Sequence, residues 1–180
     1  MSTLHQHLLK LATLLVAVAF VAASAQAERI GPLTYELWWD GNVAITDCAT
    51  DAAGTIEIPS SIDGIPVTTI GWEAFRDCRA LTGVVIPSSV ETIDSYAFQS
   101  CHALEAVSLP ENLEALHEGV FFGCGALKEV RLPEALTSIG SGAFFGSGLE
   151  RLRIPAGVIS ISGFAFGRCE RLVRIEVAPG

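Results

Sequence analysis

The chain has 180 residues, of which 50% are hydrophobic and 17% charged, and its formal net charge is −9 at pH 7. This length allows one domain or one elongated repeat array with a substantial core, and the high apolar content excludes a disordered chain. Eight prolines without a triplet glycine period exclude collagen. The acidic balance argues against a dedicated nucleic-acid binder, because such proteins rely on Lys and Arg to meet phosphates.

The N-terminus has the pattern of an export signal. Lys10 precedes the uncharged run Leu11–Ala22, and residues 25–27 (Ala-Gln-Ala) are the small-x-small pattern that signal peptidase accepts. The run is shorter than the roughly 20 residues that a membrane-spanning helix needs, which favours a cleaved leader over a retained anchor. We therefore predict a signal peptide at residues 1–27 and an exported protein, either secreted or held at the cell surface.

After the leader, the sequence repeats itself with a period close to 23 residues. Four copies share the frame L-x-x-V-x-I-P-x-x-V-x-x-I-x-x-x-A-F-x-x-C, at residues 81–101, 104–124, 127–147 and 149–169. An earlier copy at 55–78 carries five additional residues before Ile70, and a partial copy begins at Leu172. The interval before Phe166 is one residue short, near Ser147-Gly148. Self-similarity at about 20 to 29 residues with leucines at its head is typical of leucine-rich repeats.

Each copy predicts one coil of a solenoid. In the copy at 127–147, Val130 and Leu132 alternate with Glu129 and Arg131, which indicates a short strand with one face inward. A proline follows and ends the strand, because it has no N–H to donate to a ladder. One coil cannot bury its own apolar stripe, but stacked coils can. The sequence thus predicts a β-dominated solenoid of about five coils, with a short parallel strand ladder and short helical or turn segments on the other side.

The segment IPSSVETIDSYAFQSCHALEAVSLP (residues 86–110) resembles the BspA-like leucine-rich repeat, a type found in bacterial surface antigens and in some parasitic protists. The resemblance covers residues 55–180, which we interpret as the repeat array. The segment YELWWDGNVAITDC (residues 35–48) resembles the hairpin that opens such arrays, so we expect an N-terminal hairpin cap at residues 28–54.

The resemblance implies a function in binding and not in catalysis. Members of this family are mostly adhesins or surface binding proteins, so we expect a secreted or cell-surface, adhesin-like module for protein–protein or protein–glycan interaction. The alternative is a structural or assembly role, in which the solenoid stacks with itself or with a neighbouring domain.

The cap contains a turn signal and two adjacent tryptophans. Asp40-Gly41 predicts a tight primed turn between two strands. Trp39 shares a strand face with Tyr35, so we expect it to be buried in the cap. Trp38 points the other way and is the candidate for an exposed aromatic side chain that contacts a sugar.

The five cysteines form no close sequence pair. Four occupy one position of the frame, three residues after its Phe: Cys78, Cys101, Cys124 and Cys169, with Ser147 in the remaining coil. In a straight row at about 4.8 Å spacing, parallel Cβ vectors converge neither on disulfides nor on a tetrahedral zinc site. We therefore predict buried, reduced thiols and no metal.

No catalytic constellation is present after the leader. The remaining histidines, His102 and His117, fall at positions that predict exposed side chains. No G-x-S-x-G motif occurs, and the glycines of residues 140–146 miss the dinucleotide fingerprint by one residue. We therefore predict no catalytic residue and no cofactor.

The outward strand positions form the most informative surface. In chain order they are Gly83/Val85, Ala106/Ser108, Glu129/Arg131, Arg151/Arg153 and Arg174/Glu176. The last three pairs concentrate positive charge on an acidic protein, which predicts a surface for an extracellular protein segment or an anionic glycan. The candidate ligand-binding residues are Val85, Ser108, Arg131, Arg151, Arg153, Arg174 and Trp38. The alternative is cross-strand pairing for solubility, with Glu129 beside Arg151 and Glu176 beside Arg153.

The array reaches the strand-like segment 172–177 and is followed there by Ala-Pro-Gly. A solenoid needs a polar cap over its last coil, and no such segment follows. We therefore expect an open end with an unpaired strand edge. Either the natural chain continues beyond this point, or two copies join end to end as a homodimer.

Overall fold

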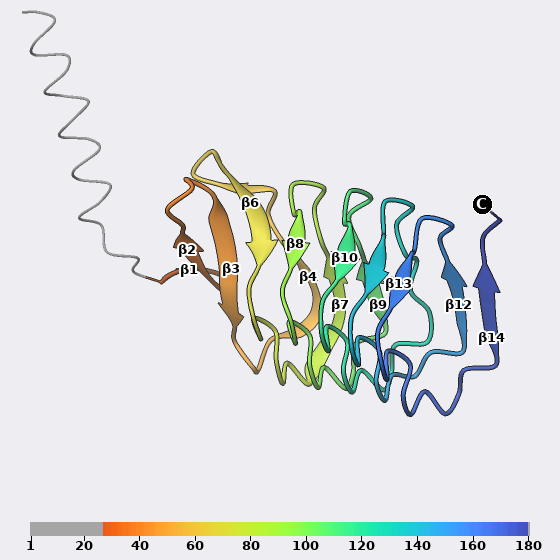
Figure 1. Ribbon diagram of the computed structural model, residues 1–180. Helices are drawn as coiled ribbons and strands as arrows, with labels where there is room; N and C mark the ends of the chain where they lie inside the picture. Colours follow the sequence, from red (N-terminus) through yellow and green to blue (C-terminus); the bar gives the residue numbers. More distant parts are fainter. Residues whose placement is uncertain (1–26, 180) are drawn as a thin grey trace, which may run out of the picture.

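The computed structural model describes residues 27–179, so the predicted signal peptide lies outside the described residues except for its last position. These residues form a stack of coils, and each coil crosses the molecule twice between two rows of short strands (Figure 1). Residues 27–179 contain no helix that could cross a membrane. The predicted β-solenoid is confirmed, and the segments on its other side are turns and short strands instead of helices.

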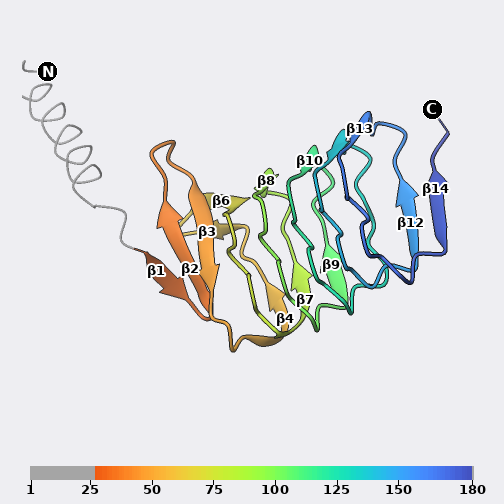
Figure 2. The same ribbon diagram turned by 60° about the horizontal axis from the view of Figure 1, so that its bottom comes forward.

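The first row holds the strands that the repeat pattern predicts. It consists of β4 (Ala53–Glu57), β7 (Ala80–Val85), β9 (Ala106–Ser108), β12 (Arg151–Ile154) and β14 (Arg174–Val177). The second row runs along the other side of the coils (Figure 2). It consists of β6 (Ile65–Ile70), β8 (Thr92–Ile93), β10 (Ala115–Leu116), β11 (Ser138–Ile139) and β13 (Ser160–Ile161). Within both rows, the strands that pair do so in parallel through equivalent residues of successive coils, for example Gly83 with Ala106.

An antiparallel cap covers the first coil. It consists of β1 (Glu28–Ile30), β2 (Leu33–Leu37) and β3 (Val43–Cys48), and β3 continues in parallel with β6. The predicted hairpin is confirmed, but the predicted primed turn at Asp40-Gly41 is wrong. Such a turn needs positive φ at both central residues, and in this loop only Gly41 has it (φ 83°). The turn is closed by a hydrogen bond from Gly41 N–H to Trp38 O at 3.0 Å.

The primed turn lies in the insertion of the first repeat instead. There, β5 (Ser61–Ile62) pairs antiparallel with the start of β6, and Ile62 faces Ile65. Asp63 and Gly64 between them have φ of 52° and 80°, the signature of a two-residue type I′ turn. The five additional residues of the first copy therefore fold outward as a hairpin and leave the stack intact.

A column of phenylalanines forms the centre of the solenoid. Successive rings stack with centroids 4.9–5.7 Å apart: Phe75, Phe98, Phe121, Phe144 and Phe166. The backbone beside the column links the same coils, because Phe98 N–H donates to Val120 O at 2.9 Å and Phe121 N–H donates to Ala143 O at 2.8 Å. The repeat period thus aligns both the apolar side chains and the backbone hydrogen bonds of neighbouring coils.

The cysteines form a second column beside the phenylalanines. All five are free; Cys169 is half-buried and the others are buried, as the sequence predicts. Each thiol of the repeat can donate to a carbonyl of the preceding coil, as Cys101 does to Phe75 O at 3.0 Å and Cys124 to Phe98 O at 3.1 Å. Desolvation raises the pKa of Cys101 to about 12, so the reactive thiolate is suppressed at neutral pH.

Truncating one ring of the column should destabilise the fold strongly. We expect Phe121→Ala to lower the free energy of unfolding by about 3–5 kcal/mol, because it leaves a cavity between two stacked rings. Phe122→Ala is the matched control, since Phe122 is only half-buried and stacks on Phe145 alone; its cost should be about 1 kcal/mol. Equilibrium urea unfolding measures both, and equal losses would show that the column is not the dominant contact.

Thiol reactivity should follow the burial of the cysteines. In the native protein at neutral pH we expect slow labelling by a maleimide reagent, fastest at Cys169 because it alone among the repeat thiols is not fully buried. After denaturation without reductant, all five thiols should label. Mass spectrometry after labelling measures this, and recovery of disulfide-linked peptides would contradict the expectation.

Candidate functional site

The first strand row is interrupted in the coil that begins at Leu127. Residues 128–132 form no strand, and the row separates into the sheets β4-β7-β9 and β12-β14. The backbone of these residues makes one hydrogen bond to a neighbouring coil, from Glu150 N–H to Lys128 O at 2.9 Å. The strands of the predicted ladder therefore lie where the sequence placed them, but the ladder is not continuous. The second row is divided as well, between β8 and β10, whereas β10, β11 and β13 pair without a break.

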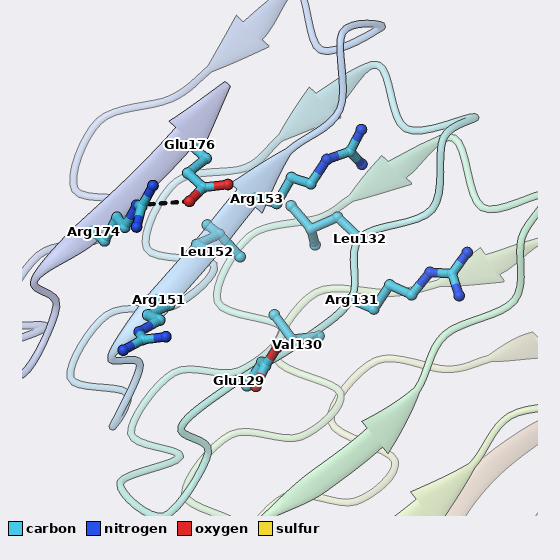
Figure 3. Close-up of a pocket in the computed structure, with 9 residues that line it drawn as sticks. All are labelled: Glu129, Val130, Arg131, Leu132, Arg151, Leu152, Arg153, Arg174 and Glu176. Atoms are coloured by element: carbon cyan, nitrogen blue, oxygen red, sulfur yellow. Dashed lines mark ion pairs between the residues drawn. The ribbon is translucent and has the colours of Figure 1, made fainter. Parts of the chain in front are cut away.

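A groove of about 370 Å³ lies at this interruption (Figure 3). Its lining residues are Glu129, Val130, Arg131, Leu132, Arg151, Leu152, Arg153, Arg174 and Glu176. The apolar floor comes from Val130, Leu132 and Leu152, and the arginine side chains fan outward around it. The four arginines that the sequence singled out thus line one groove. The floor was not foreseen, because alternation assigns these apolar residues to the core, where they are indeed 3–5% exposed.

Acidic side chains neutralise three of the four arginines. Arg131 lies 3.4 Å from Glu111, Arg153 lies 2.6 Å from Glu134, and Arg174 lies 2.6 Å from Glu176. All of these groups are more than half exposed, so each pair stabilises the fold little. The two pairs that the sequence suggested, Glu129 with Arg151 and Glu176 with Arg153, are not the ones formed. Glu111 and Glu134, which follow the strand-ending prolines, are counter-ions that the strand pattern alone did not identify.

Arg151 differs from the other three arginines. Among the described residues it has no ion-pair partner, and the β12–β14 register places it directly opposite Arg174. Like charges opposite each other on neighbouring strands are destabilising. An anion placed between these two side chains would relieve the repulsion, so Arg151 marks the part of the groove that is best suited to a negatively charged ligand.

The remaining candidate residues lie elsewhere. Val85 and Ser108 line a separate hollow of about 350 Å³ over β7 and β9, on the other side of the interruption. Trp38 is half-buried and Trp39 is 96% exposed, so the prediction that Trp39 is buried and Trp38 exposed is wrong. The reason is that β2 ends at Leu37, so strand alternation does not extend to the two tryptophans.

Two histidines, His102 and His117, lie in the part of the chain that the structure describes. His102 and His117 are exposed, as predicted, and His102 Nδ1 lies 3.0 Å from Gly123 O. In the part of the chain that the structure describes, no three His, Cys, Asp or Glu residues group in a way that could hold a metal ion. The groove therefore presents charged side chains and apolar contacts to a ligand.

The family can now be assigned. A family model described as "BspA type Leucine rich repeat region" matches residues 50–175 in six copies, which is more than half of the chain. The chain belongs to the BspA-type leucine-rich repeat family. The matched region includes all five predicted coils.

Solved structures of bacterial leucine-rich repeat proteins share the BspA-type fold. A leucine-rich cell surface protein from Faecalibacterium prausnitzii is 33% identical with a TM-score of 0.79, and the match covers 86% of this chain and 40% of that one. A protein from Bacteroides ovatus is 32% identical (TM-score 0.75; 83% and 40% covered), and one from T. pallidum is 30% identical (0.77; 83% and 71%). The chain therefore spans about 40% of the length of two of these relatives. No curated protein matches it.

The shortened BspA-type repeat requires a close backbone contact next to the groove. The missing residue falls at Ser147-Gly148, just before β12. A Cβ atom added to Gly148 would overlap the carbonyl oxygen of Gly125 in the preceding coil, whereas a Cβ on Gly125 would meet nothing within 4 Å. Because it has no Cβ atom, Gly148 lets the shortened turn lie against the preceding coil. This turn leads directly into β12, which forms one wall of the groove.

Adding one methyl group at this corner should destabilise the protein. We expect Gly148→Ala to lower the free energy of unfolding by about 1–3 kcal/mol, because either the Gly125 carbonyl or the corner must shift. Gly125→Ala is the matched control and should change stability by no more than about 0.5 kcal/mol, since its side of the corner is open. Equilibrium urea unfolding compares them, and an unaffected Gly148→Ala variant would contradict the close contact.

Proposed function

We propose that this protein is a non-catalytic binding module, secreted or displayed at the cell surface, that captures an acidic segment of a partner protein in the basic groove. The observation that carries the proposal is Arg151, which has no ion-pair partner among the described residues and lies opposite Arg174. Four of the chain's eleven basic residues line this one groove on a protein with a net charge of −9. A guanidinium group without a partner attracts anionic groups of a ligand and repels cationic ones.

The chemistry of the groove suits carboxylates. A guanidinium group presents its N–H donors as a planar fork that matches a carboxylate in two parallel hydrogen bonds. Arg151 has no competing partner, and the three paired arginines can exchange exposed intramolecular carboxylates for those of a ligand at little cost.

The floor of the groove favours a protein ligand over a glycan. Val130, Leu132 and Leu152 line the bottom of the groove below the arginines and, at 3–5% exposed, offer a ligand a small apolar contact. Sugars bind preferentially where aromatic rings line the site, and the two strongly exposed tryptophans, Trp39 and Trp72, are not among the residues of the groove. An acidic segment with interspersed apolar residues is therefore the ligand class that we propose.

Two observations support a position outside the cell. The N-terminal 27 residues have the pattern of a cleaved export signal, and the F. prausnitzii relative is named as a cell surface protein. The leucine-rich repeat family consists of binding scaffolds, which agrees with a role in adhesion or capture. An adhesin-like function outside the cell is the simplest role for a scaffold with these features.

The proposal is tested with an acidic peptide and a sulfated glycan as probes. We expect a fluorescent peptide of alternating Glu and Leu to bind the wild-type protein, with an affinity that falls as salt concentration rises. Arg151→Glu should weaken this binding at least tenfold, or about 1.4 kcal/mol. Arg29→Glu is the matched control, because it makes the same charge change at an exposed position of the cap.

The outcome separates the two ligand classes. If heparin binds in an Arg151-dependent manner and the peptide does not bind, the acidic-protein version of the proposal is wrong and the glycan version holds. If neither probe depends on Arg151, or if Arg29→Glu weakens binding equally, the groove is not the binding site. Fluorescence anisotropy with both variants at two salt concentrations provides the measurement.

A further inference from the structure

A further hollow lies beside Gly125, the residue on which the shortened turn packs. Its volume is about 580 Å³, against about 370 Å³ for the groove, and we call it the corner hollow. Its lining residues are His102, Glu105, Gly125, Ala126, Lys128 and Arg171. We infer that the corner hollow is a second anion-binding site, which continues the groove and takes the next part of the same acidic segment. This inference rests on the function proposed for the groove.

The corner hollow results from small residues in two successive coils. The position after the column cysteine holds His102 in one coil, Gly125 in the next and Gly148 in the one after that, which also lacks a residue equivalent to Ala126. A Cβ atom on Gly125 would meet nothing within 4 Å, so the space beside it is open. His102 and Arg171 are three coils apart, or about 14 Å at the spacing of paired strands. Arg171 alone comes from the last coil, so the space itself lies within the array.

Two cationic side chains line the corner hollow without a counter-ion. Lys128 and Arg171 are exposed, and neither forms an ion pair with any residue between 27 and 179, including Glu105, the single carboxylate of the lining. The corner hollow therefore has an excess of positive charge, which attracts anionic groups of a ligand. By contrast, five arginines of the described chain have acidic partners: Arg76, Arg79, Arg131, Arg153 and Arg174.

One segment of chain joins the corner hollow to the groove. Gly125, Ala126 and Lys128 line the corner hollow, and residues 129–132, which follow directly, line the groove. Glu150 N–H donates to Lys128 O at 2.9 Å, so Lys128 lies next to the start of β12, where Arg151 is located. An extended ligand advances about 3.3 Å per residue, so three or four further residues carry it from Arg151 into the corner hollow. Arg151, Lys128 and Arg171 thus provide three cations without partners along one path.

The corner hollow also contains hydrogen-bond acceptors, which suit a peptide better than a uniformly anionic chain. His102 Nδ1 lies 3.0 Å from Gly123 O, and because a carbonyl oxygen only accepts, Nδ1 carries a proton and Nε2 of the neutral ring is free to accept. The carboxylate of Glu105 is a second acceptor. The backbone N–H groups of a peptide can donate to both, whereas Glu105 repels the sulfate groups of a glycan. These acceptors therefore favour the acidic protein segment proposed for the groove.

Lys128 allows a direct test, because it is the single lysine after the predicted leader. The probe is a twelve-residue peptide of alternating Glu and Leu with one carboxylate converted to an N-hydroxysuccinimide ester. Attack by Lys128 Nζ forms an amide bond and releases N-hydroxysuccinimide. The matched control is Arg29→Lys, which adds an exposed amine on the cap at constant charge. Mass spectrometry should find the peptide on Lys128 at least ten times more often than at position 29, and equal labelling would contradict the inference.

Filling the corner hollow tests it without a change of charge. Gly125→Leu places a side chain in the open space beside the backbone, and thermal unfolding checks that the fold is intact. We expect this variant to weaken binding of the twelve-residue peptide at least fivefold and that of a six-residue peptide, which occupies the groove alone, less than twofold. Lys128→Gln should have the same selective effect, whereas Arg29→Gln should affect neither peptide. Fluorescence anisotropy measures all of these affinities.

The results distinguish the corner hollow from the groove. If Gly125→Leu and Lys128→Gln leave the twelve-residue peptide unaffected while Arg151→Glu weakens both peptides, the inference is wrong and the function proposed for the groove stands. If Arg151→Glu weakens neither peptide, the groove is not the binding site, and its continuation into the corner hollow is wrong as well. Heparin binding that depends on Gly125, without peptide binding, would assign the corner hollow to a glycan and overturn the peptide.

Discussion

The whole structure depends on the inability of a single coil to bury its own apolar side chains. Each coil contributes one ring to the phenylalanine column and a short segment to each strand row, and the inward side chains gain a buried face only when the next coil stacks on them. The 23-residue period is what keeps equivalent residues in register. Where the period changes, the chain compensates locally. The first copy folds its additional residues outward as a hairpin, and in the shortened copy Gly148 lets the backbone lie close to Gly125 of the preceding coil.

This dependence explains how far the sequence could predict the fold. The spacing of Phe, Cys and Pro determines which residues face inward, and these predictions are confirmed because periodicity reports directly on stacking. Turn geometry was less predictable. The same dipeptide, Asp-Gly, forms a primed turn at residues 63–64 but not at residues 40–41, since in the cap the strand before it ends at Leu37. The exposure of Trp39 follows from that same early strand end.

The groove illustrates a second limit of the pattern. Its arginines were identifiable, because they occupy outward positions of successive strands. The opening between the coils was not, since residues 128–132 keep the alternation of a paired strand and yet make a single backbone hydrogen bond to a neighbouring coil. Whether a segment pairs is determined by the coils on both sides of it as well as by its own residues. The groove lies at that lost pairing, and Val130, Leu132 and Leu152 line its floor.

The cysteine column has a consequence for the environments in which the protein can exist. Its thiols act as hydrogen-bond donors to carbonyl groups of the preceding coil, and they stabilise the stack without forming any covalent bond. Ser147 occupies the same position in one coil, where its hydroxyl oxygen lies 3.4 Å from Cys169 Sγ. Among residues 27–179 the stack therefore contains no disulfide whose reduction could weaken it. A chain built in this way needs no disulfide-forming enzyme to fold, in a reducing compartment or in an oxidising one.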